Sequence, residues 1–320
     1  MLSELTFQVA IRIVASLRSA AVGGFVSVVV PTRNRAEKLG VCLDSLLAQD
    51  FVADDYEIVV VDDGSTDATA RAVQDLIDGH SPRAITLVSQ RPAGSNAARN
   101  AGFNTARGDP VLFVDDDVEA PPTWLSTMAE GFRAYPDAPA FAARVRLRLE
   151  HPRRRDCPRH PLAASLDLGE RDVRVPSAVG AAIAVRRTTI DRVGPFDPWT
   201  TGGDDTEWFD RLAASGGHLM YLGRASVWHR RTASDLGIVR IVRSSFRRGV
   251  IAHRYFARTG RTDIARRGVS VSASLLVAAL RERCLGALAN AALQAGFAYG
   301  VVRYRRVQPP DRVTTRHSSR

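Results

Sequence analysis

The chain has 320 residues, of which 45% are hydrophobic and 24% are charged, and this composition suits a globular protein with one sizeable core rather than a disordered chain. The net charge of +10 is concentrated at one end: residues 236–320 hold 17 arginines against three acidic residues, and the first 235 residues carry a net charge of −4. We therefore expect no specific nucleic-acid partner, and one main domain followed by a basic appendage.

Cysteine usage and the start of the chain bear on the cellular setting. Cys42, Cys157 and Cys284 lie far apart, without a CxxC motif or a Cys/His pair. This disfavours a disulfide framework and a structural zinc site, and favours a reducing, cytoplasmic setting. Residues 1–24 place charged residues such as Glu4 and Arg12 among apolar ones, which predicts an amphipathic lead-in helix rather than a secretory signal.

Strand and helix patterns alternate along the first third of the chain. The predicted strands are residues 25–31, 56–61, 84–88 and 110–114, and the predicted helices are 35–49, 66–77 and 95–106. This alternation indicates a mainly parallel α/β sheet, in which ligands bind beyond the carboxyl ends of the strands. Further on, seven arginines and two prolines in residues 144–160 predict an irregular exposed loop.

Acidic residues follow two of the predicted strands. Asp62 and Asp63 could bind a nucleobase or ribose hydroxyls, or could cap the next helix. The run Asp115, Asp116 and Asp117 is harder to explain structurally, because clustered acids raise one another's pKa unless a cation offsets them. A divalent ion, Mg²⁺ or Mn²⁺, is the natural counter-charge, and a solvated acidic loop is the alternative.

Five motifs occur in one order: PTRNR (31–35), VVDDGSTD (60–67), GSNAARNAG (94–102), FVDDD (113–117) and GGDDTEW (202–208). Together they resemble the family 2 glycosyltransferases of the GT-A fold, over residues 25–229. The resemblance implies a Rossmann-like transferase domain at 25–235, with a nucleotide-sugar half (25–118), an acceptor half (119–235) and a basic helical region (236–320).

The resemblance also implies the donor site. The nucleotide would contact Pro31, Thr32, Arg33, Asp62, Asp63, Arg99, Asp115 and Asp116. Mn²⁺ or Mg²⁺ would be held by Asp115, Asp117 and His229. UDP- and dTDP-sugars are both open as donors. Arg99 also fits a surface arginine, and His229 also fits a structural histidine.

The GGDDTEW motif places two acids at the start of a predicted helix, where the helix dipole favours their ionised form. An ionised carboxylate can take the proton of an acceptor hydroxyl, so that direct displacement inverts the anomeric centre. The family usually has Glu-Asp here, so we assign the base to Asp205, with Asp204 beside it. Gly180, Glu207 and Trp208 are the expected acceptor contacts, although Trp208 also fits a core position.

The basic C-terminal region is expected to be helical. Residues 238–257 show arginines at helical spacing, and residues 269–280 and 285–302 are apolar, the second at the lower edge of membrane-spanning length. These segments could lie at a membrane surface near a lipid-linked acceptor, or pack as a helical hairpin.

The whole pattern predicts a metal-dependent inverting glycosyltransferase that uses a nucleotide diphosphate donor and a saccharide, lipid-linked or small-molecule acceptor hydroxyl. Its localisation is predicted to be cytoplasmic, with contact at the inner membrane face. A sugar nucleotidyltransferase is a rival, but residues 31–35 lack the glycines of that class's loop. A non-catalytic nucleotide- or polyanion-binding module is the second alternative function.

Overall fold

The computed structural model describes residues 25–79, 85–150, 164–198, 204–258 and 284–303, together with Leu275 and Val277. The chain divides into two compact units, residues 1–237 and 238–320. The expected lead-in at 1–24 and the apolar stretch at 269–280, apart from Leu275 and Val277, lie outside the described residues.

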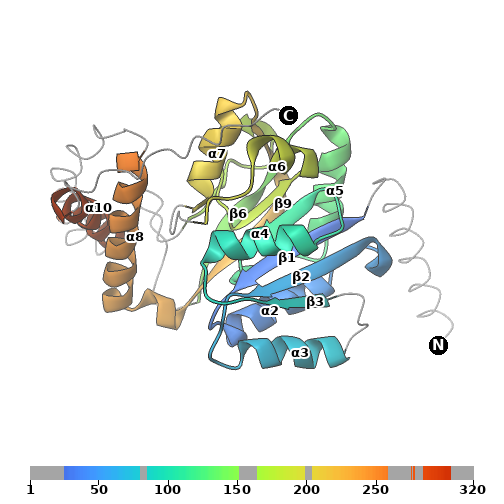
Figure 1. Ribbon diagram of the computed structural model, residues 1–320, viewed down its shortest axis with the longest axis horizontal. Helices are drawn as coiled ribbons and strands as arrows, with labels where there is room; N and C mark the ends of the chain where they lie inside the picture. Colours follow the sequence, from blue (N-terminus) through green and yellow to red (C-terminus); the bar gives the residue numbers. More distant parts are fainter. Residues whose placement is uncertain are drawn as a thin grey trace, which may run out of the picture. The chain divides into compact units, whose positions relative to one another are not determined.

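A single sheet organises the described part of the first unit (Figure 1). Its strands lie in the order β3-β2-β1-β4-β8-β6-β9-β5, and β7 also pairs with β9. The first four strands in sequence, which are mutually parallel, are β1 (Val26–Thr32), β2 (Tyr56–Asp62), β3 (Ile85–Ser89) and β4 (Val111–Val114). The others are β5 (Val118–Glu119), β6 (Ala140–Glu150), β7 (Val173–Val175), β8 (Ala182–Val185) and β9 (Leu219–Thr232).

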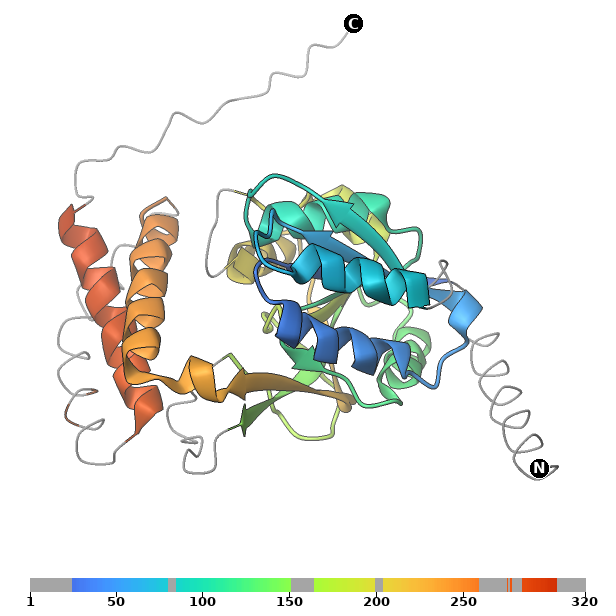
Figure 2. The ribbon, with the colours of Figure 1, turned by 90° about the horizontal axis from the view of Figure 1, so that it is seen from below.

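Helices cover both faces of the sheet, and for that reason the inner strands are mostly apolar, with Ser27 and Glu57 as buried polar residues. Val28, Val30 and Val60 face one layer, and Val29 and Val61 face the opposite layer, because successive strand residues alternate sides. The first layer contains α2 (Ala36–Leu47), α3 (Thr69–Gly79) and α5 (Trp124–Ala134). The second contains α4 (Ser95–Thr105), α6 (Arg187–Val193) and α7 (Asp204–Ala214). Figures 1 and 2 show α2 and α3 side by side.

Close packing of α4 on the sheet depends on a glycine. A Cβ at Gly102 would lie 2.2 Å from Val29 Cγ1, closer than any real contact, so a larger residue would push the helix away from β1. Two short 3-10 helices, η1 (Ala53–Asp55) and η2 (Ala233–Leu236), complete the described elements of this unit.

The predicted mainly parallel α/β sheet is confirmed, with helix and strand ends shifted by at most three residues. The predicted loop at residues 144–160 is wrong in its first part, because β6 continues to Glu150. Val145, Leu147 and Leu149 alternate there with arginines, which is a strand pattern that the nearby prolines obscured. Residues 151–163 lie outside the described residues.

In its described part, the second unit contains two packed helices, α8 (Ile238–Arg258) and α10 (Leu285–Arg303). Glycines allow a very close approach: a Cβ at Gly249 would lie 1.8 Å from Leu293 O, and one at Gly296 would lie 1.9 Å from Phe246 O. Among the described residues, no helix combines the length and apolar character needed to cross a membrane.

Candidate functional site

The acidic cluster lies where buried strand β4 ends. Asp115 follows Val114 directly, and its N–H donates to Ala181 O at 3.0 Å, which joins the cluster to the start of β8. The chain then turns, with Val118 N donating to Asp115 O at 3.1 Å, and enters β5. Asp116 and Asp117 are consequently buried, at 5% and 3% exposure.

Strand pairing brings His229 to this cluster. Val118 of β5 lies opposite His229 of β9, and Arg230 N donates to Asp117 O at 2.8 Å. The ligand atoms of Asp115, Asp117 and His229 all lie within 4.8 Å of one another. The structure thus unites the three residues that the resemblance implied as metal ligands.

The hydrogen bonds of His229 prepare its ring for a cation. Its Nδ1 lies 2.8 Å from Ala164 O, and because a carbonyl can only accept, Nδ1 carries the proton. The lone pair is then on Nε2, which lies 3.1 Å from Asp117 Oδ1. A backbone acceptor that fixes the histidine tautomer in this way is typical of metal-binding histidines. The donor set therefore fits a divalent cation.

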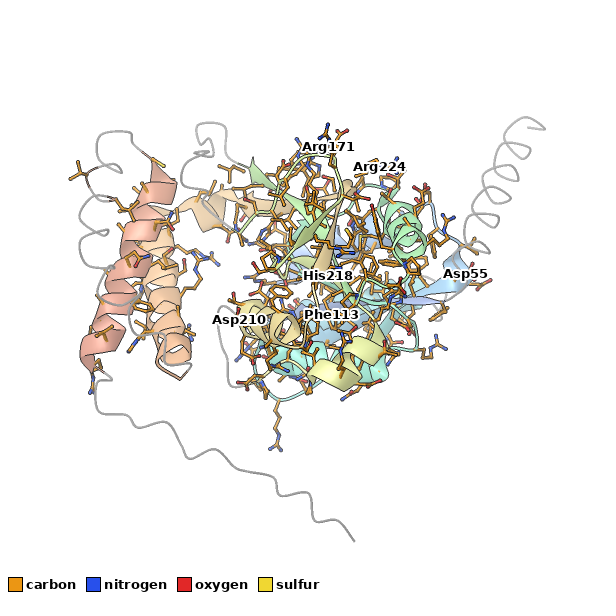
Figure 3. All side chains as sticks on the ribbon, turned by 90° about the horizontal axis from the view of Figure 1, so that it is seen from above. Asp55, Phe113, Arg171, Asp210, His218 and Arg224 are labelled. Carbon is orange, nitrogen blue, oxygen red and sulfur yellow. The ribbon has the colours of Figure 1, made fainter. Side chains whose placement is uncertain are left out.

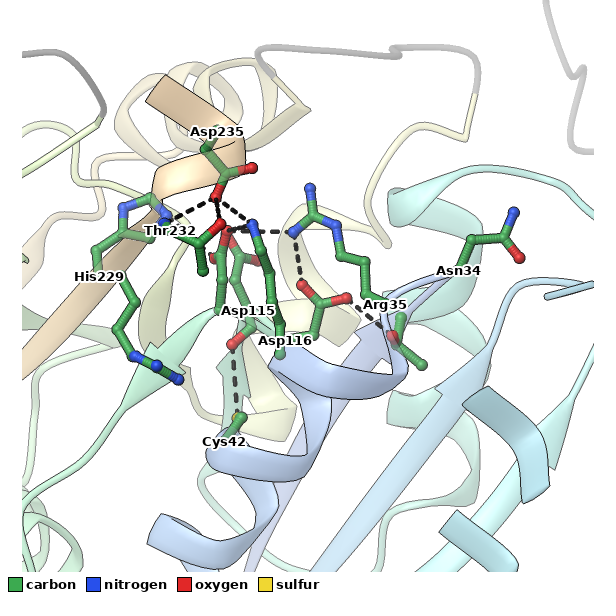
Figure 4. Close-up of polar contacts among 12 residues, drawn as sticks. Asn34, Arg35, Cys42, Asp115, Asp116, His229, Thr232 and Asp235 are labelled. Carbon is green, nitrogen blue, oxygen red and sulfur yellow. Dashed lines mark hydrogen bonds and ion pairs between the residues drawn. The ribbon is translucent and has the colours of Figure 1, made fainter. Parts of the chain in front are cut away.

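Basic side chains surround the same carboxylates (Figure 4). Arg35 Nη1 donates to Asp116 Oδ1 at 2.7 Å and lies 3.2 Å from Asp117 Oδ2. Arg99 Nη2 donates to Asp115 Oδ1 at 3.0 Å, and Arg231 Nη1 donates to Asp117 Oδ2. The three acids thus have three arginine partners.

Lys38 adds a further positive charge. Its Nζ lies 2.5 Å from Asp235 Oδ2 and 4.0 Å from Asp117 Oδ2. Asp235 also accepts from Thr232 N and Oγ1, at 3.1 and 3.0 Å, in the capping box of η2. The chain thus supplies arginine and lysine counter-charges in addition to the divalent ion that the sequence argument named. The case for a cation rests on the donor set.

Burial and charge act differently on neighbouring carboxyls. Burial raises the pKa of Asp116 to about 6, against the opposing charge of Arg35. Burial also acts to raise the pKa of Asp117, but the positive charges of Arg231 and Arg35 outweigh burial and leave this pKa well below its usual range. Asp117 is thus held as a buried anion.

The PTRNR and VVDDGSTD motifs form the adjacent loops. Pro31 and Thr32 are the last residues of β1, and the Thr32 hydroxyl donates to Asp116 Oδ2 at 2.8 Å. Asp62 Oδ1 accepts from Ser65 N at 2.9 Å in a turn that precedes α3, so Asp62 does not cap that helix, which begins at Thr69. Arg33 is half exposed, with Nη1 4.0 Å from Asp63 Oδ2.

Asp63 anchors the loop that leads to α4. Its Oδ1 accepts from Gln90 Nε2 at 2.8 Å and from Ala93 N at 2.7 Å, and its Oδ2 accepts from Gly94 N at 2.9 Å. Arg99, which follows on α4, is buried at 6% exposure, so it is not a surface arginine. The expected donor residues all lie around the carboxyl ends of β1, β2 and β4.

The expected acceptor acid lies close to this cluster. Asp205, in the first turn of α7, accepts through Oδ2 from Gly180 N at 2.6 Å. Gly180 precedes Ala181, whose carbonyl accepts from Asp115 N, so two hydrogen bonds connect Asp205 to the acidic cluster. Gly180 must be small, because a Cβ would lie 2.8 Å from Asp205 Oδ2. Asp204 begins α7, and its side chain lies outside the described structure.

Two expected acceptor contacts have structural partners instead. Trp208 is fully buried between Phe196 and Phe209, and its Nε1 donates to Gly194 O at 3.0 Å. A sugar has no exposed ring face on which to stack, so the expectation for Trp208 is wrong and its core alternative holds. Both Glu207 oxygens accept from Arg211, at 2.6 and 2.9 Å.

Sequence reasoning missed Arg35, Lys38, Arg231 and Asp235 as members of the site. Arg231 had a usable signal, since it lies two residues after His229, and residues two apart in a strand share a face. Lys38 is the only lysine in the chain, but its meaning depends on contact with Asp235, nearly 200 residues away.

Comparison with known proteins identifies the family. The family described as Glycosyl transferase family 2 matches residues 27–194, just over half of the chain. The chain belongs to glycosyltransferase family 2. The glycosyltransferase AglE of Haloferax volcanii is 26% identical over 198 residues, 62% of this chain and 64% of that protein. The pre-mycofactocin glycosyltransferase of Mycobacterium tuberculosis is 32% identical over 212 residues, 64% of this chain and 42% of that protein.

A solved structure supports the GT-A fold of this family 2 chain. The mannosyltransferase PcManGT of Pyrobaculum calidifontis, in complex with GDP-Man and Mn²⁺, has a TM-score of 0.56 at 22% identity. The match covers 81% of this chain and 74% of that one, so the predicted GT-A fold is confirmed. The chain spans less than two thirds of the length of AglE and of the pre-mycofactocin glycosyltransferase.

Proposed function

We propose that this chain transfers a sugar from a nucleoside diphosphate donor to an acceptor hydroxyl, with Mn²⁺ or Mg²⁺ bound, and with inversion at the anomeric carbon. The observation that carries the proposal is the grouping of Asp115, Asp117 and His229 within 4.8 Å at the carboxyl end of β4. In open α/β sheets ligands bind at this edge.

The donor diphosphate would lie beside this group, with its base and ribose toward the loops after β1 and β2. Pro31, Thr32 and Arg33 belong to the first loop, and Asp62 and Asp63 to the second. Asp116 holds Thr32 and Arg35, so it sets the shape of the first loop rather than facing a ligand alone. UDP- and dTDP-sugars remain the proposed donors.

Asp115, Asp117 and His229 would hold the divalent ion. When bound, the ion supplies positive charge to the diphosphate, which bears the negative charge of the leaving group. Arg99 and Arg35 keep the neighbouring carboxylates oriented, since each donates to one of them. Burial of Asp117, at 3% exposure, excludes water from its side of the site.

Asp205 is the proposed general base. Its carboxylate would accept the proton of the acceptor hydroxyl as that oxygen bonds to the anomeric carbon and the diphosphate leaves with the old bond's electron pair. The Gly180 N–H donates to Asp205 Oδ2, and this hydrogen bond orients the carboxylate without neutralising its charge. Asp204 would be its neighbour in the same turn.

Acceptor binding and localisation form a separate part of the proposal. A saccharide, lipid-linked or small-molecule acceptor would approach over Gly180, and the enzyme would act in the cytoplasm. Peripheral contact with anionic lipid fits α8, on which Arg240, Arg243 and Arg247 are exposed together with Ile238 and Val239, at 51% and 69% exposure. Full-length protein should cosediment with anionic but not with neutral vesicles, and equal recovery with both would reject this contact.

The test of the main proposal is release of nucleoside diphosphate over a panel of UDP-, dTDP- and GDP-sugars, with Mn²⁺, Mg²⁺ or a chelator. Metal-dependent release with at least one donor is expected. Tight nucleotide binding without release over the whole panel would instead support the non-catalytic binding module.

A further inference from the structure

Arg231 lies against two of the three residues of the candidate cation group. It follows His229 by two residues on β9, so both side chains point to the same face, and Arg230 points to the opposite face toward Glu119 and Glu150. Arg231 Nη1 donates to Asp117 Oδ2, and its Nη2 lies 2.8 Å from His229 Nε2. One guanidinium therefore bridges a carboxylate and an imidazole.

The contact with His229 creates a conflict. Nδ1 donates to Ala164 O, so Nε2 is the ring atom with a lone pair, and Arg231 uses that lone pair as its acceptor. One lone pair cannot serve a guanidinium and a metal ion at once. Arg35 and Arg99 raise no such conflict, since their contacts with the acidic cluster are with carboxylate oxygens and each carboxylate offers several lone pairs.

We propose that Arg231 is a positioning residue that competes with the divalent cation for His229 and Asp117, and that binds the donor's diphosphate once the cation has displaced it. This inference rests on the proposed function. The planar fork of arginine suits bidentate phosphate binding, and the side chain is 21% exposed, so it can reach a ligand at the surface of the cluster.

The exchange makes the cation and the donor bind cooperatively. A cation alone must displace Arg231 and leave its charge beside the new ion, whereas a cation with a diphosphate gives Arg231 an anionic partner. By linkage, each ligand then raises the affinity for the other. If Arg231 only supported Asp117 and His229, its loss would disorder both ligands and weaken the binding of the cation alone.

The test is binding of Mn²⁺ alone, and of UDP and GDP at saturating Mn²⁺, to the full chain and to Arg231→Gln. Arg231→Gln should bind Mn²⁺ alone about tenfold more tightly and the nucleoside diphosphate about tenfold more weakly, a scale set by one charge-assisted hydrogen bond. Arg224→Gln is the matched control, since Arg224 is an exposed arginine on the same strand (Figure 3), and it should change neither affinity.

Reduced or unchanged Mn²⁺ affinity in Arg231→Gln would overturn the inference, as would unchanged nucleotide affinity. If Arg231→Gln does not fold, Arg231→Lys replaces it: a single ammonium cannot bridge both groups, so Mn²⁺ should again bind more tightly than to wild type. The two proposals fail separately. If wild type turns over a nucleotide sugar but Arg231→Gln leaves the Mn²⁺ affinity unchanged, only the Arg231 exchange is rejected. If Arg231→Gln binds Mn²⁺ more tightly but wild type turns over no donor, only the transferase proposal is rejected.

Discussion

Asp117→Asn tests whether the acidic cluster is held by its own arginines. The amide keeps the shape of the side chain and loses the charge, so Arg231 and Arg35 would face a neutral group. The NH₂ of the new asparagine is a donor, as the guanidinium groups are, so it cannot replace the lost acceptor oxygen. Removal of one partner from a fully buried ion pair costs about 3–5 kcal/mol. Both arginines are partly exposed, at 21% and 43%, and regain some hydration, so we expect a loss of roughly 2 kcal/mol.

That loss should lower the melting temperature by about 4–8 °C in a unit of this size. Thermal denaturation of the full chain would be followed for wild type, Asp117→Asn, Arg231→Gln and the double variant. The double variant should be more stable than the sum of the single effects predicts, by about 1 kcal/mol, because the uncompensated charge is gone. Asp75→Asn, which removes a carboxylate that is 70% exposed, should have almost no effect. Strictly additive single effects, or an Asp117→Asn variant as stable as wild type, would refute the charge network.

Three further predictions concern packing and pH. Gly296→Val should destabilise the α8–α10 pair and speed hydrogen exchange of residues 284–303, because its Cβ would meet Phe246 O at 1.9 Å. Gly40→Ala, where the new Cβ would have no atom within 4 Å, should not change that exchange. Equal exchange rates in the two variants would contradict the packing. Burial acts to raise the pKa of Glu57, but hydrogen bonds from Ser27 and Arg107 outweigh it and lower this pKa, so its stabilisation is present above about pH 4.3 and is lost as the pH falls further. The melting temperature should accordingly fall less steeply from pH 6 to pH 3 in Glu57→Gln than in wild type. An equally steep fall in both proteins would count against this. Trp208→Ala should cost about 3–5 kcal/mol of stability, as a buried core residue does, whereas a sugar-stacking residue would leave stability unchanged.

The sequence was informative wherever one local pattern determined the structure. Valine-rich runs such as residues 26–30 and 58–61 predicted strands buried on both faces, and the acids that follow them fell at the expected edge of the sheet. The ordered motifs indicated the family, and the resemblance grouped Asp115, Asp117 and His229 as the expected metal ligands. Helix ends were less accurate: α3 begins at Thr69, where Asp67 Oδ1 accepts from Thr69 N at 2.9 Å, rather than at Thr66.

The missing parts depend on contacts between distant segments. Arg35, Lys38 and Arg231 acquire their meaning only when β1, α2 and β9 meet at Asp117, and a sequence window contains just one of these elements at a time. Trp208 was ambiguous for a related reason. One turn into a helix, an aromatic residue can face a ligand or the core, and the choice was decided by Phe196 from a different loop.

In the proposed mechanism, Asp205 activates the acceptor at a donor site built on Asp115, Asp117 and His229. The most direct measurement compares nucleoside diphosphate binding and sugar transfer in wild type, Asp205→Asn, Asp204→Asn and the double variant, with the donor and metal that support transfer. We expect Asp205→Asn to bind the nucleotide as wild type does and to transfer sugar roughly 10²-fold or more slowly, the scale of a lost general base. Wild-type transfer by Asp205→Asn but not by Asp204→Asn would reverse the assignment of the two neighbours, and full transfer by the double variant would contradict the mechanism itself.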